Sequence, residues 1–281
     1  MTDVARPTIG EMRARYPDMF AVSWRRRAAI LATGAALAAL FVFGVVHLDI
    51  TYSRIWSGIW QIGWFFSLMM PPTAGAYFWL YTRALGETLA IAFLGTLIAA
   101  TLALPVGVLV ARNVMPVWIA RFLGRRFLDS IRGVDTLIWA LIWIGVVGLG
   151  PFAGVLAIAT SDFGALGKLF AEAIESADRR PSDGIRSVGG TALDEIRFGL
   201  IPQVLPIIAG QVLYYFESNV RSATIIGIVG AGGIGLHLSE EIRTLEWPHV
   251  AFIILMMMAT VAIIDWLSSK LRFAIIGDRA I

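Results

Sequence analysis

Long apolar stretches without charged side chains dominate the sequence and leave one class of fold open. Four of them reach the length of about 20 residues that a helix needs to cross a bilayer, namely residues 28–46, 88–110, 198–216 and 249–267. The only Asp, Glu, Lys or Arg within them is Asp265, near the end of the fourth. Charged residues make up 15% of the chain, whereas a soluble domain carries about a quarter. Because helices satisfy their own backbone hydrogen bonds in lipid, the sequence predicts an all-α, polytopic membrane protein.

A fifth uncharged stretch, residues 136–161, is interrupted by Gly148–Pro151 (GLGP). It forms either one long helix or a hairpin of two helices. Cytoplasmic loops carry an excess of Lys and Arg, and residues 25–27 (RRR) place the N-terminus inside. With the hairpin, only four arginines face the outside: Arg54, Arg83, Arg221 and Arg243. The cytoplasmic set is Arg112, Arg121, Arg125, Arg126, Arg179, Arg180, Arg186, Arg197, Lys270, Arg272 and Arg279. We therefore expect about six transmembrane helices in a bacterial inner membrane, with both termini in the cytoplasm.

The first apolar stretch lacks a nearby A-x-A cleavage site and predicts a retained membrane anchor. After it, Trp56, Trp60 and Trp64 recur every four residues and Pro71-Pro72 stops the helix. Because Trp prefers the membrane–water interface, this segment predicts an interfacial helix on the outer face rather than a seventh span. The predicted division is a cytoplasmic segment (1–27), the first transmembrane helix (28–46), an outer-face segment (47–83), a core of further spans (84–272) and a cytoplasmic tail (273–281).

The composition argues against several other functions. The net charge is +3, but the arginines stand beside apolar stretches, where they orient helices, so no nucleic-acid partner is expected. The absence of cysteine excludes disulfides and thiolate zinc sites. The three histidines, His47, His237 and His249, are far apart in the sequence and predict surface positions rather than a metal site.

Two glycine patterns resemble nucleotide sites without meeting their requirements. Residues 230–235 (GAGGIG) follow a strand-like run, 223–229, but Leu255 stands where a dinucleotide site requires an acidic residue. Residues 167–169 (GKL) do not complete a Walker A motif, so this chain does not hydrolyse ATP alone. Glycine-rich backbone between spans predicts a packed re-entrant turn, a pore-lining segment or close helix packing.

Polar residues gather just past the stretch 198–216, namely Glu217, Asn219, Arg221 and Thr224. Glu217 and Arg221 can pair on one helix face, and ionisable groups at the edge of a span are equally candidates for a substrate path. Both interpretations stay open. Glu87 predicts a carboxylate at a helix N-terminus, where the helix dipole favours it.

A polar segment, residues 172–197, separates two apolar stretches. Ser182 can cap a short helix with Asp183 in its first turn, and Gly189-Gly190 can end that helix. A second helix can begin near Thr191, with Asp194 and Glu195 early in it. A short surface helix between two spans can dock into a partner's groove; the alternative is an ordinary solvated loop.

The segment Asp183-Gly184-Ile185, followed by Gly189 and by Leu200-Ile201-Pro202, resembles a degenerate E-A-A-x-x-x-G…I-x-L-P loop of binding-protein-dependent ABC importer permeases. It departs from that pattern with Asp for Glu, Gly-Ile for Ala-Ala, Gly199 for Ile and Ile201 for Leu. The flanking sequences resemble the phosphonate-importer permeases over about residues 80–272. These flanks are Ala111–Asn113, Gly148–Pro151, Leu166–Glu175, Pro202–Pro206 and Phe216–Gly235.

The resemblance implies a type I importer permease with no catalytic residue, metal or cofactor of its own. Its implied partners are a second copy, two cytoplasmic ATPase subunits that hold ATP and magnesium, and an outer binding protein that delivers phosphonate. The coupling loop would be residues 178–197, with coupling residues Asp183, Gly184, Ile185, Arg186 and Gly189. The expected translocation path is Glu217, Asn219, Arg221 and Thr224. The expected hinge and gate residues are Pro105, Pro202, Pro206, Gly230, Gly232 and Gly233.

Two alternatives remain. One is a permease of the same fold for methionine, phosphate or phosphite. The other is a secondary transporter or channel, which predicts internal repeats and ionisable residues near span centres. The charge-free stretches weigh against the second alternative.

Overall fold

The computed structural model describes Gly10 and residues 24–276, and it divides into two compact units that meet at Ser67–Leu68. The first unit contains α3 (Trp24–His47), which covers the first predicted span, and almost all of α4 (Tyr52–Leu68), which carries the three regularly spaced tryptophans. Most of the predicted N-terminal cytoplasmic segment and the end of the predicted tail lie outside the described residues. The helix α4 ends before Pro71, as the sequence predicts.

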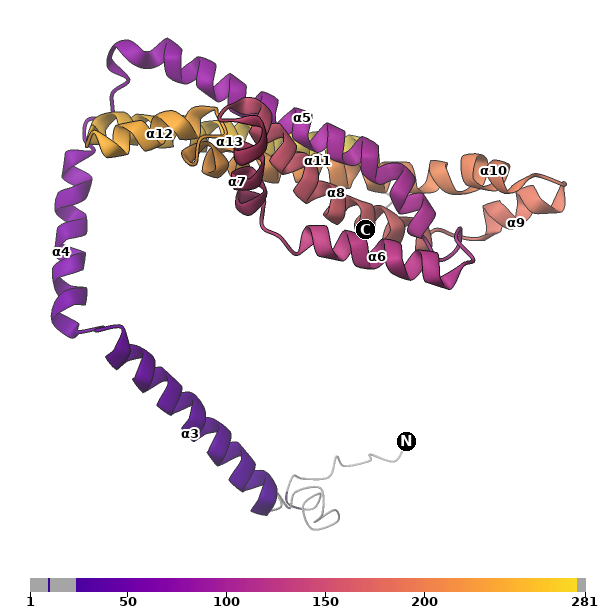
Figure 1. Ribbon diagram of the computed structural model, residues 1–281, viewed down its shortest axis with the longest axis horizontal. Helices are drawn as coiled ribbons and strands as arrows, with labels where there is room; N and C mark the ends of the chain where they lie inside the picture. The colour runs from indigo at the N-terminus through magenta and orange to yellow at the C-terminus, as the bar shows by residue number, and fades with distance from the viewer. Residues whose placement is uncertain (1–9, 11–23, 277–281) are drawn as a thin grey trace, which may run out of the picture. The chain divides into compact units, whose positions relative to one another are not determined.

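The second unit is a helical bundle (Figure 1). Its elements are η1 (Gly75–Tyr77), α5 (Phe78–Val110), α6 (Trp118–Arg132), α7 (Thr136–Val147), α8 (Pro151–Glu175), α9 (Arg180–Ser187), α10 (Ala192–Asp194), the π-helix η2 (Glu195–Leu200), α11 (Ile201–Ile228), α12 (Ile234–Arg243) and α13 (Trp247–Ile276).

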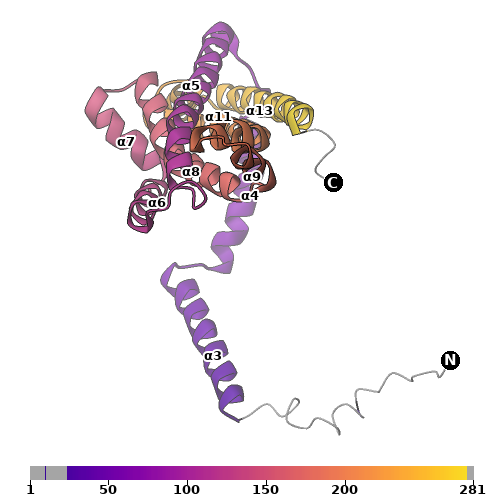
Figure 2. The ribbon, with the colours of Figure 1, turned by 90° about the vertical axis from the view of Figure 1, so that its right-hand side faces the viewer.

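Small residues hold the centre of this bundle together. The helices α5 and α8 pack along most of their lengths, because a Cβ at Gly95 would lie 2.7 Å from Ile158 and one at Gly107 would lie 2.8 Å from Phe170. The helix α11 packs against both, and α7 and α13 flank this core on opposite sides (Figure 2). Close backbone approach through glycine is a common way for helices to associate in lipid.

Among the described residues, five helical segments are long and apolar enough to cross a membrane, and a bent pair, α6 and α7, makes a possible sixth. The predicted break at Gly148–Pro151 is confirmed, with positive φ angles of 91° at Gly148 and 135° at Gly150. The third crossing is not a single straight helix. At about 1.5 Å per residue, α7 alone rises only about 18 Å, and α6 meets it at a bend of 85°.

Several local interpretations change because the helices are longer than their apolar stretches. The helix α5 begins at Phe78, so Glu87 lies inside it rather than at its N-terminus. The helix α11 extends to Ile228, so the strand-like run 223–229 is almost entirely its last turns. For the same reason Glu217 and its polar neighbours lie within α11 rather than beyond its end.

Candidate functional site

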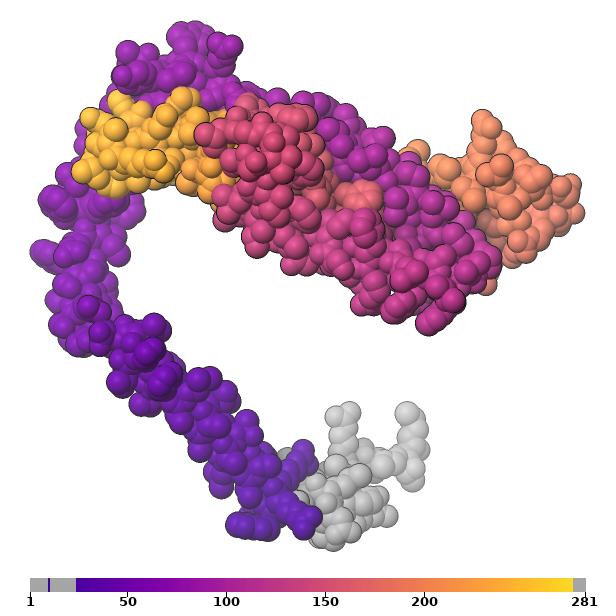
Figure 3. Space-filling view, in the orientation of Figure 1, coloured from indigo at the N-terminus to yellow at the C-terminus, as the bar shows by residue number. Residues whose placement is uncertain are grey.

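The helix α9 protrudes from one end of the second unit, together with α10 (Figure 3). Its start differs from the prediction: it begins at Arg180, and the Asp178 carboxylate accepts a hydrogen bond from the Arg180 N–H at 3.1 Å. Ser182 therefore lies inside the helix and does not cap it. The predicted end is confirmed, because Gly189 has φ +83° and the Gly190 N–H bonds to the Ile185 carbonyl at 3.0 Å. Glycine commonly ends a helix in this conformation.

The segment that follows α9 and leads back to the spans, α10 and η2, is bonded to α9. Thr191 caps α10 through a reciprocal capping box with Asp194, as its position in the sequence predicts. The Arg186 guanidinium donates to both oxygens of Glu195, at 2.9 and 3.2 Å, and this hydrogen bond raises the pKa of Arg186. A Cβ at Gly199 would lie 3.1 Å from the Ser182 Cα. The contact surface of α9 is thus linked directly to η2 and through it to α11.

Gln203 is a connecting residue whose role the sequence does not reveal. Its amide NH₂ donates to the carbonyls of Asp178, at 3.1 Å, and Gly199, at 2.6 Å, while its carbonyl oxygen accepts from the Asp178 N–H at 3.1 Å. The only sequence signal is a side-chain amide next to Pro202, where a helix start lacks one backbone donor. Gln203, in the first turn of α11, therefore binds both the N–H and the carbonyl of Asp178, the first residue of the predicted coupling loop.

The predicted coupling residues divide into two groups. Asp183, Gly184 and Arg186 are exposed, and a Cβ at Gly184 would meet nothing within 4 Å. Ile185 is half-buried and lies against Gly190 instead. The outward surface available to a partner is therefore formed by the exposed group, joined by Val188, whose side chain is also exposed.

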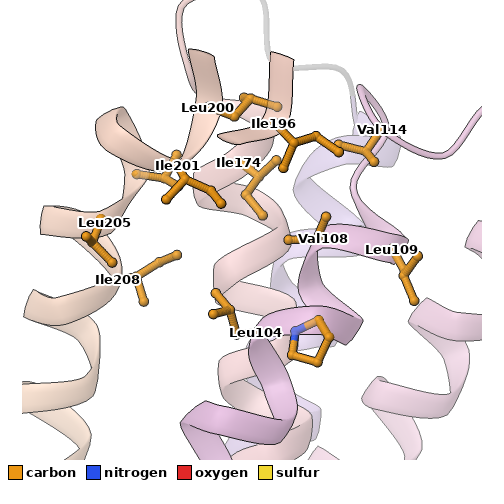
Figure 4. A pocket seen from close by; sticks show the side chains of 12 residues that line it. Leu104, Val108, Leu109, Val114, Ile174, Ile196, Leu200, Ile201, Leu205 and Ile208 are labelled. Atoms are coloured by element: carbon orange, nitrogen blue, oxygen red, sulfur yellow. The ribbon is translucent and has the colours of Figure 1, made fainter. Parts of the chain in front are cut away.

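Two cavities surround the junction between α9 and the spans. A polar cavity of about 320 Å³ lies beside α9 and is lined by residues that include Asp183, Arg186 and Glu195. An apolar cavity of about 430 Å³ lies where α5, α8, η2 and α11 meet (Figure 4). Its lining is Leu104, Pro105, Val108, Leu109, Val114, Ile174, Ile196, Leu200, Ile201, Val204, Leu205 and Ile208. Leu104, Leu109 and Leu205 of this lining are 40–56% exposed, so the hollow opens to the surface of the chain and is not a void in its packed core.

Two guanidinium groups converge on one carboxylate between α11 and α13. Arg221 lies 3.3 Å from Glu217 on the same helix, and Arg272 of α13 lies 3.2 Å from the other Glu217 oxygen. The Arg221 side chain is 47% exposed, whereas that of Glu217 is 9% exposed. Arg221 and Glu217 also line a groove of about 450 Å³ between the two helices, with Asp265 at its edge. Arg272, which the topology prediction places at the cytoplasmic end, is the member of this group that sequence reasoning missed.

The other two predicted path residues on α11 face the packed interior. The Asn219 amide donates to Asp162 of α8 and, at 2.8 Å, to the Thr96 hydroxyl of α5. Thr224 is buried and donates to the Val220 carbonyl at 3.3 Å. The structure therefore brings Glu217 and Arg221 to an open groove and joins Asn219 to a buried network that ties three helices together.

The Asn219→Leu substitution is expected to destabilise the bundle by about 3 kcal/mol, because it leaves the buried Asp162 carboxyl without its donor. Thermal unfolding of the purified protein measures this loss. Adding Asp162→Ala should restore most of the stability, since removing both partners of a buried hydrogen bond costs far less than removing one. An unchanged melting temperature in the single variant would contradict the network's role.

The predicted gate glycines form a tight turn between α11 and α12. Gly230, Gly232 and Gly233 have φ angles of 104°, 82° and 71°. The Gly233 N–H donates to the Glu87 carboxylate at 2.9 Å, and the Ile234 N–H donates to the Thr88 hydroxyl at 2.8 Å. This turn is packed onto α5, and Gly230 accepts a bond at 3.0 Å from Gly150 in the turn before α8.

The predicted proline hinges occupy different settings. Pro105 lies inside α5 and Pro206 inside α11, whereas Pro202 is in the first turn of α11. Two of the histidines, His237 and His249, both lie beside Tyr81 although they are separated in the sequence, with ring centroids 6.1 and 6.3 Å away. Tyr81 donates to Glu241 at 2.8 Å in the same cluster.

Comparison with known proteins agrees with this architecture. Residues 103–275 match the family described as binding-protein-dependent transport system inner membrane component. A putative phosphite transport system permease protein, HtxC, of Stutzerimonas stutzeri is 37% identical over 90% of each chain. The phosphite transport system permease protein PtxC of the same organism is 36% identical over 93% of this chain and 94% of its own length.

A third relative is the phosphate-import permease protein PhnE of Mycolicibacterium smegmatis, 36% identical over 88% of this chain and 47% of its own. Among solved structures, an inward-facing MetNI methionine ABC transporter chain superposes with a TM-score of 0.62 at 19% identity, covering 72% of this chain and 99% of that chain. That likeness concerns the fold alone. The family match over more than half of the chain and the two full-length relatives establish that this protein belongs to the binding-protein-dependent transport system inner membrane components.

Proposed function

We propose that this chain is the membrane permease of an ATP-driven importer whose cargo is a phosphorus oxyanion, either phosphonate or a close relative such as phosphite or phosphate. The family is that of transport-system membrane components. The cargo is supported by the relatives, which are named as phosphite and phosphate permeases. A methionine cargo has weaker support, because the methionine transporter shares only the fold at 19% identity.

Energy would enter at the protruding helix α9. This chain lacks a Walker A motif, so ATP and magnesium would be held by two separate ATPase subunits that bind the exposed face of α9 in each of two permease copies. Since Arg186, Gly199 and Gln203 link α9 to η2 and α11, a displacement of α9 would move α11. The apolar cavity at this junction leaves room for side chains to repack.

The cargo would meet the groove between α11 and α13, and this is the observation that carries the choice of an anion. Charged groups within spans face protein or water rather than lipid, so the exposed Arg221 marks the side of the bundle that a second copy or a water-filled path covers. A planar guanidinium matches the oxygens of phosphate-like anions. Glu217 holds Arg221 and Arg272 in place when no anion is bound.

Transport needs no covalent chemistry in this scheme. The permease alternates between two helix packings, and each partner biases the equilibrium by binding one packing better than the other. An outer binding protein would deliver the cargo, and ATP binding would draw the two α9 helices together. In this proposal both termini lie in the cytoplasm, as the distribution of basic residues predicts.

The Arg221→Gln substitution tests the path. In cells that express the permease with its neighbouring ATPase and binding protein, we expect uptake of labelled phosphite and methylphosphonate to fall about 10- to 100-fold, because loss of a charge-assisted hydrogen bond costs about 1.5–3 kcal/mol. Co-purification of the ATPase should be unchanged.

The matched control is Arg243→Gln, which removes an exposed arginine of α12 outside the groove. Uptake by the Arg221→Gln protein equal to that of the unchanged protein would remove Arg221 from the path. Failure of the unchanged system to take up any phosphorus oxyanion would instead overturn the proposed cargo, and the ligand bound to the binding protein would identify the replacement.

A further inference from the structure

We propose that a cavity beside α6 binds the phosphate headgroup of an anionic phospholipid. The cavity has a volume of about 290 Å³. Its lining consists of four arginines and two aromatic residues, namely Arg112, Arg121, Arg125, Arg126, Trp118 and Phe122. This site is separate from the groove between α11 and α13, it shares only Arg112 with the polar cavity beside α9, and it does not depend on which cargo is carried.

The cavity lies at the level where a bilayer's headgroups are found. Arg112 follows directly after the last turn of α5, and Arg125 is paired with Glu175, the last residue of α8. The ends of two long spans therefore fix its height. Because the hydrocarbon core ends where spans end, a phosphate in this cavity would stand in the polar layer of the membrane.

The arginines keep donors available for an anion. Arg121 donates to the Met115 carbonyl at 3.3 Å, and Arg126 lies 3.4 Å from Asp129 with its guanidinium 5.5 Å from the Phe122 ring centroid. Each guanidinium has five N–H donors, so these contacts use only part of them. The neighbouring carboxylates are Glu175, facing Arg112 and Arg125, and Asp129, which is also bound by Lys168 at 2.7 Å. The positive charges outnumber the negative ones around the cavity.

The surface next to the cavity favours a lipid over a soluble phosphate. The helix α6 packs against α8 through the buried Leu128, and Gly124 contacts Val110 of α5. On its other side Ile119, Leu123 and Phe127 are 57–61% exposed. Acyl chains of a lipid held by its headgroup would cover these side chains. Basic pockets between spans at one membrane face bind anionic headgroups in this manner.

The test uses the intact complex with its ATPase, purified in a neutral detergent. Native mass spectrometry with added phosphatidylglycerol should show specific lipid binding, with phosphatidylcholine at least tenfold weaker. The variant Arg121→Gln/Arg126→Gln should bind phosphatidylglycerol roughly 30-fold more weakly, because each arginine near an anionic membrane surface contributes roughly a fivefold factor. The matched control Arg83→Gln/Arg243→Gln should bind normally, since both arginines are exposed and neither lines the cavity.

A second measurement uses the unchanged protein and does not depend on the variant folding. Phosphatidylglycerol with a photoreactive headgroup should label residues 112–126 in the complex. Unchanged affinity in the double variant, equal binding of phosphatidylcholine, or labelling confined to other segments would each overturn the proposal. Full displacement of the label by millimolar inorganic phosphate would show a site for soluble anions and would also overturn it.

Discussion

A chain that carries Asp183→Lys together with Gly184→Trp is expected to fold normally and to lose its ATPase partner. A Cβ at Gly184 would meet nothing within 4 Å in its own chain, so a larger side chain there starts into open space. On the outward face it would block the partner's groove, and the lysine reverses the charge beside it. A misfit at the centre of an interface costs about 3 kcal/mol or more, at least roughly 100-fold in affinity. Uptake should therefore fall to background.

The measurement is the amount of ATPase that co-purifies with a tagged permease, alongside the melting temperature of the permease itself. The control is Gly58→Trp in α4, where an added Cβ also meets nothing within 4 Å. Normal amounts of bound ATPase together with normal uptake would show that residues 178–197 are an ordinary solvated loop.

The Gly235→Ala substitution is expected to cause the largest loss of stability in the second unit. A Cβ at this position would lie 2.0 Å from the Thr224 carbonyl oxygen and 2.9 Å from the Gly227 Cα. Because both contacts are with backbone atoms, no side chain can rotate away, and α12 must separate from α11. That separation strains the bonds of Gly233 and Ile234 to α5. Overpacking and strained buried hydrogen bonds together cost about 3–5 kcal/mol.

Thermal unfolding and the amount of protein in the membrane both report this loss, with an expected fall in melting temperature of about 10 °C or more. The control is Gly86→Ala in α5, where the added methyl group meets nothing within 4 Å and alanine favours the helix. Equal melting temperatures for the two variants would mean that the α11–α12 contact has little weight.

The spans could be predicted from the sequence because their signal is local. An uncharged stretch such as 88–110 contains its own reason to enter lipid, and the break at Gly148–Pro151 is equally local. The helix α6 was missed because its charged residues exclude it from any search for apolar segments. Only the structure shows that Asp129 is neutralised by Lys168, 39 positions along the chain.

The candidate site likewise combines features that local sequence predicts with contacts that only the folded structure brings together. The end of α9 and the start of α10 depend on residues a few positions apart, so Gly189 and Thr191 could be interpreted correctly. Asn219 could not, because its partners Thr96 and Asp162 are 123 and 57 positions away. Arg272 joined the Arg221 group only through the packing of α13 on α11, which no local pattern specifies.

The π-helix at Glu195–Leu200 lets the loop accommodate a change of one residue in its length. A turn closed by i→i+5 bonds holds one residue more than an α-helical turn over nearly the same rotation, so deleting one residue there would convert the wide turn to an ordinary one and leave α9 close to its present direction. In the α-helical part of α11, each residue instead turns the chain by about 100° and raises it by about 1.5 Å. A deletion near the start of α11 would therefore turn Asp183 and Gly184 to a new direction with every side chain of α9 intact.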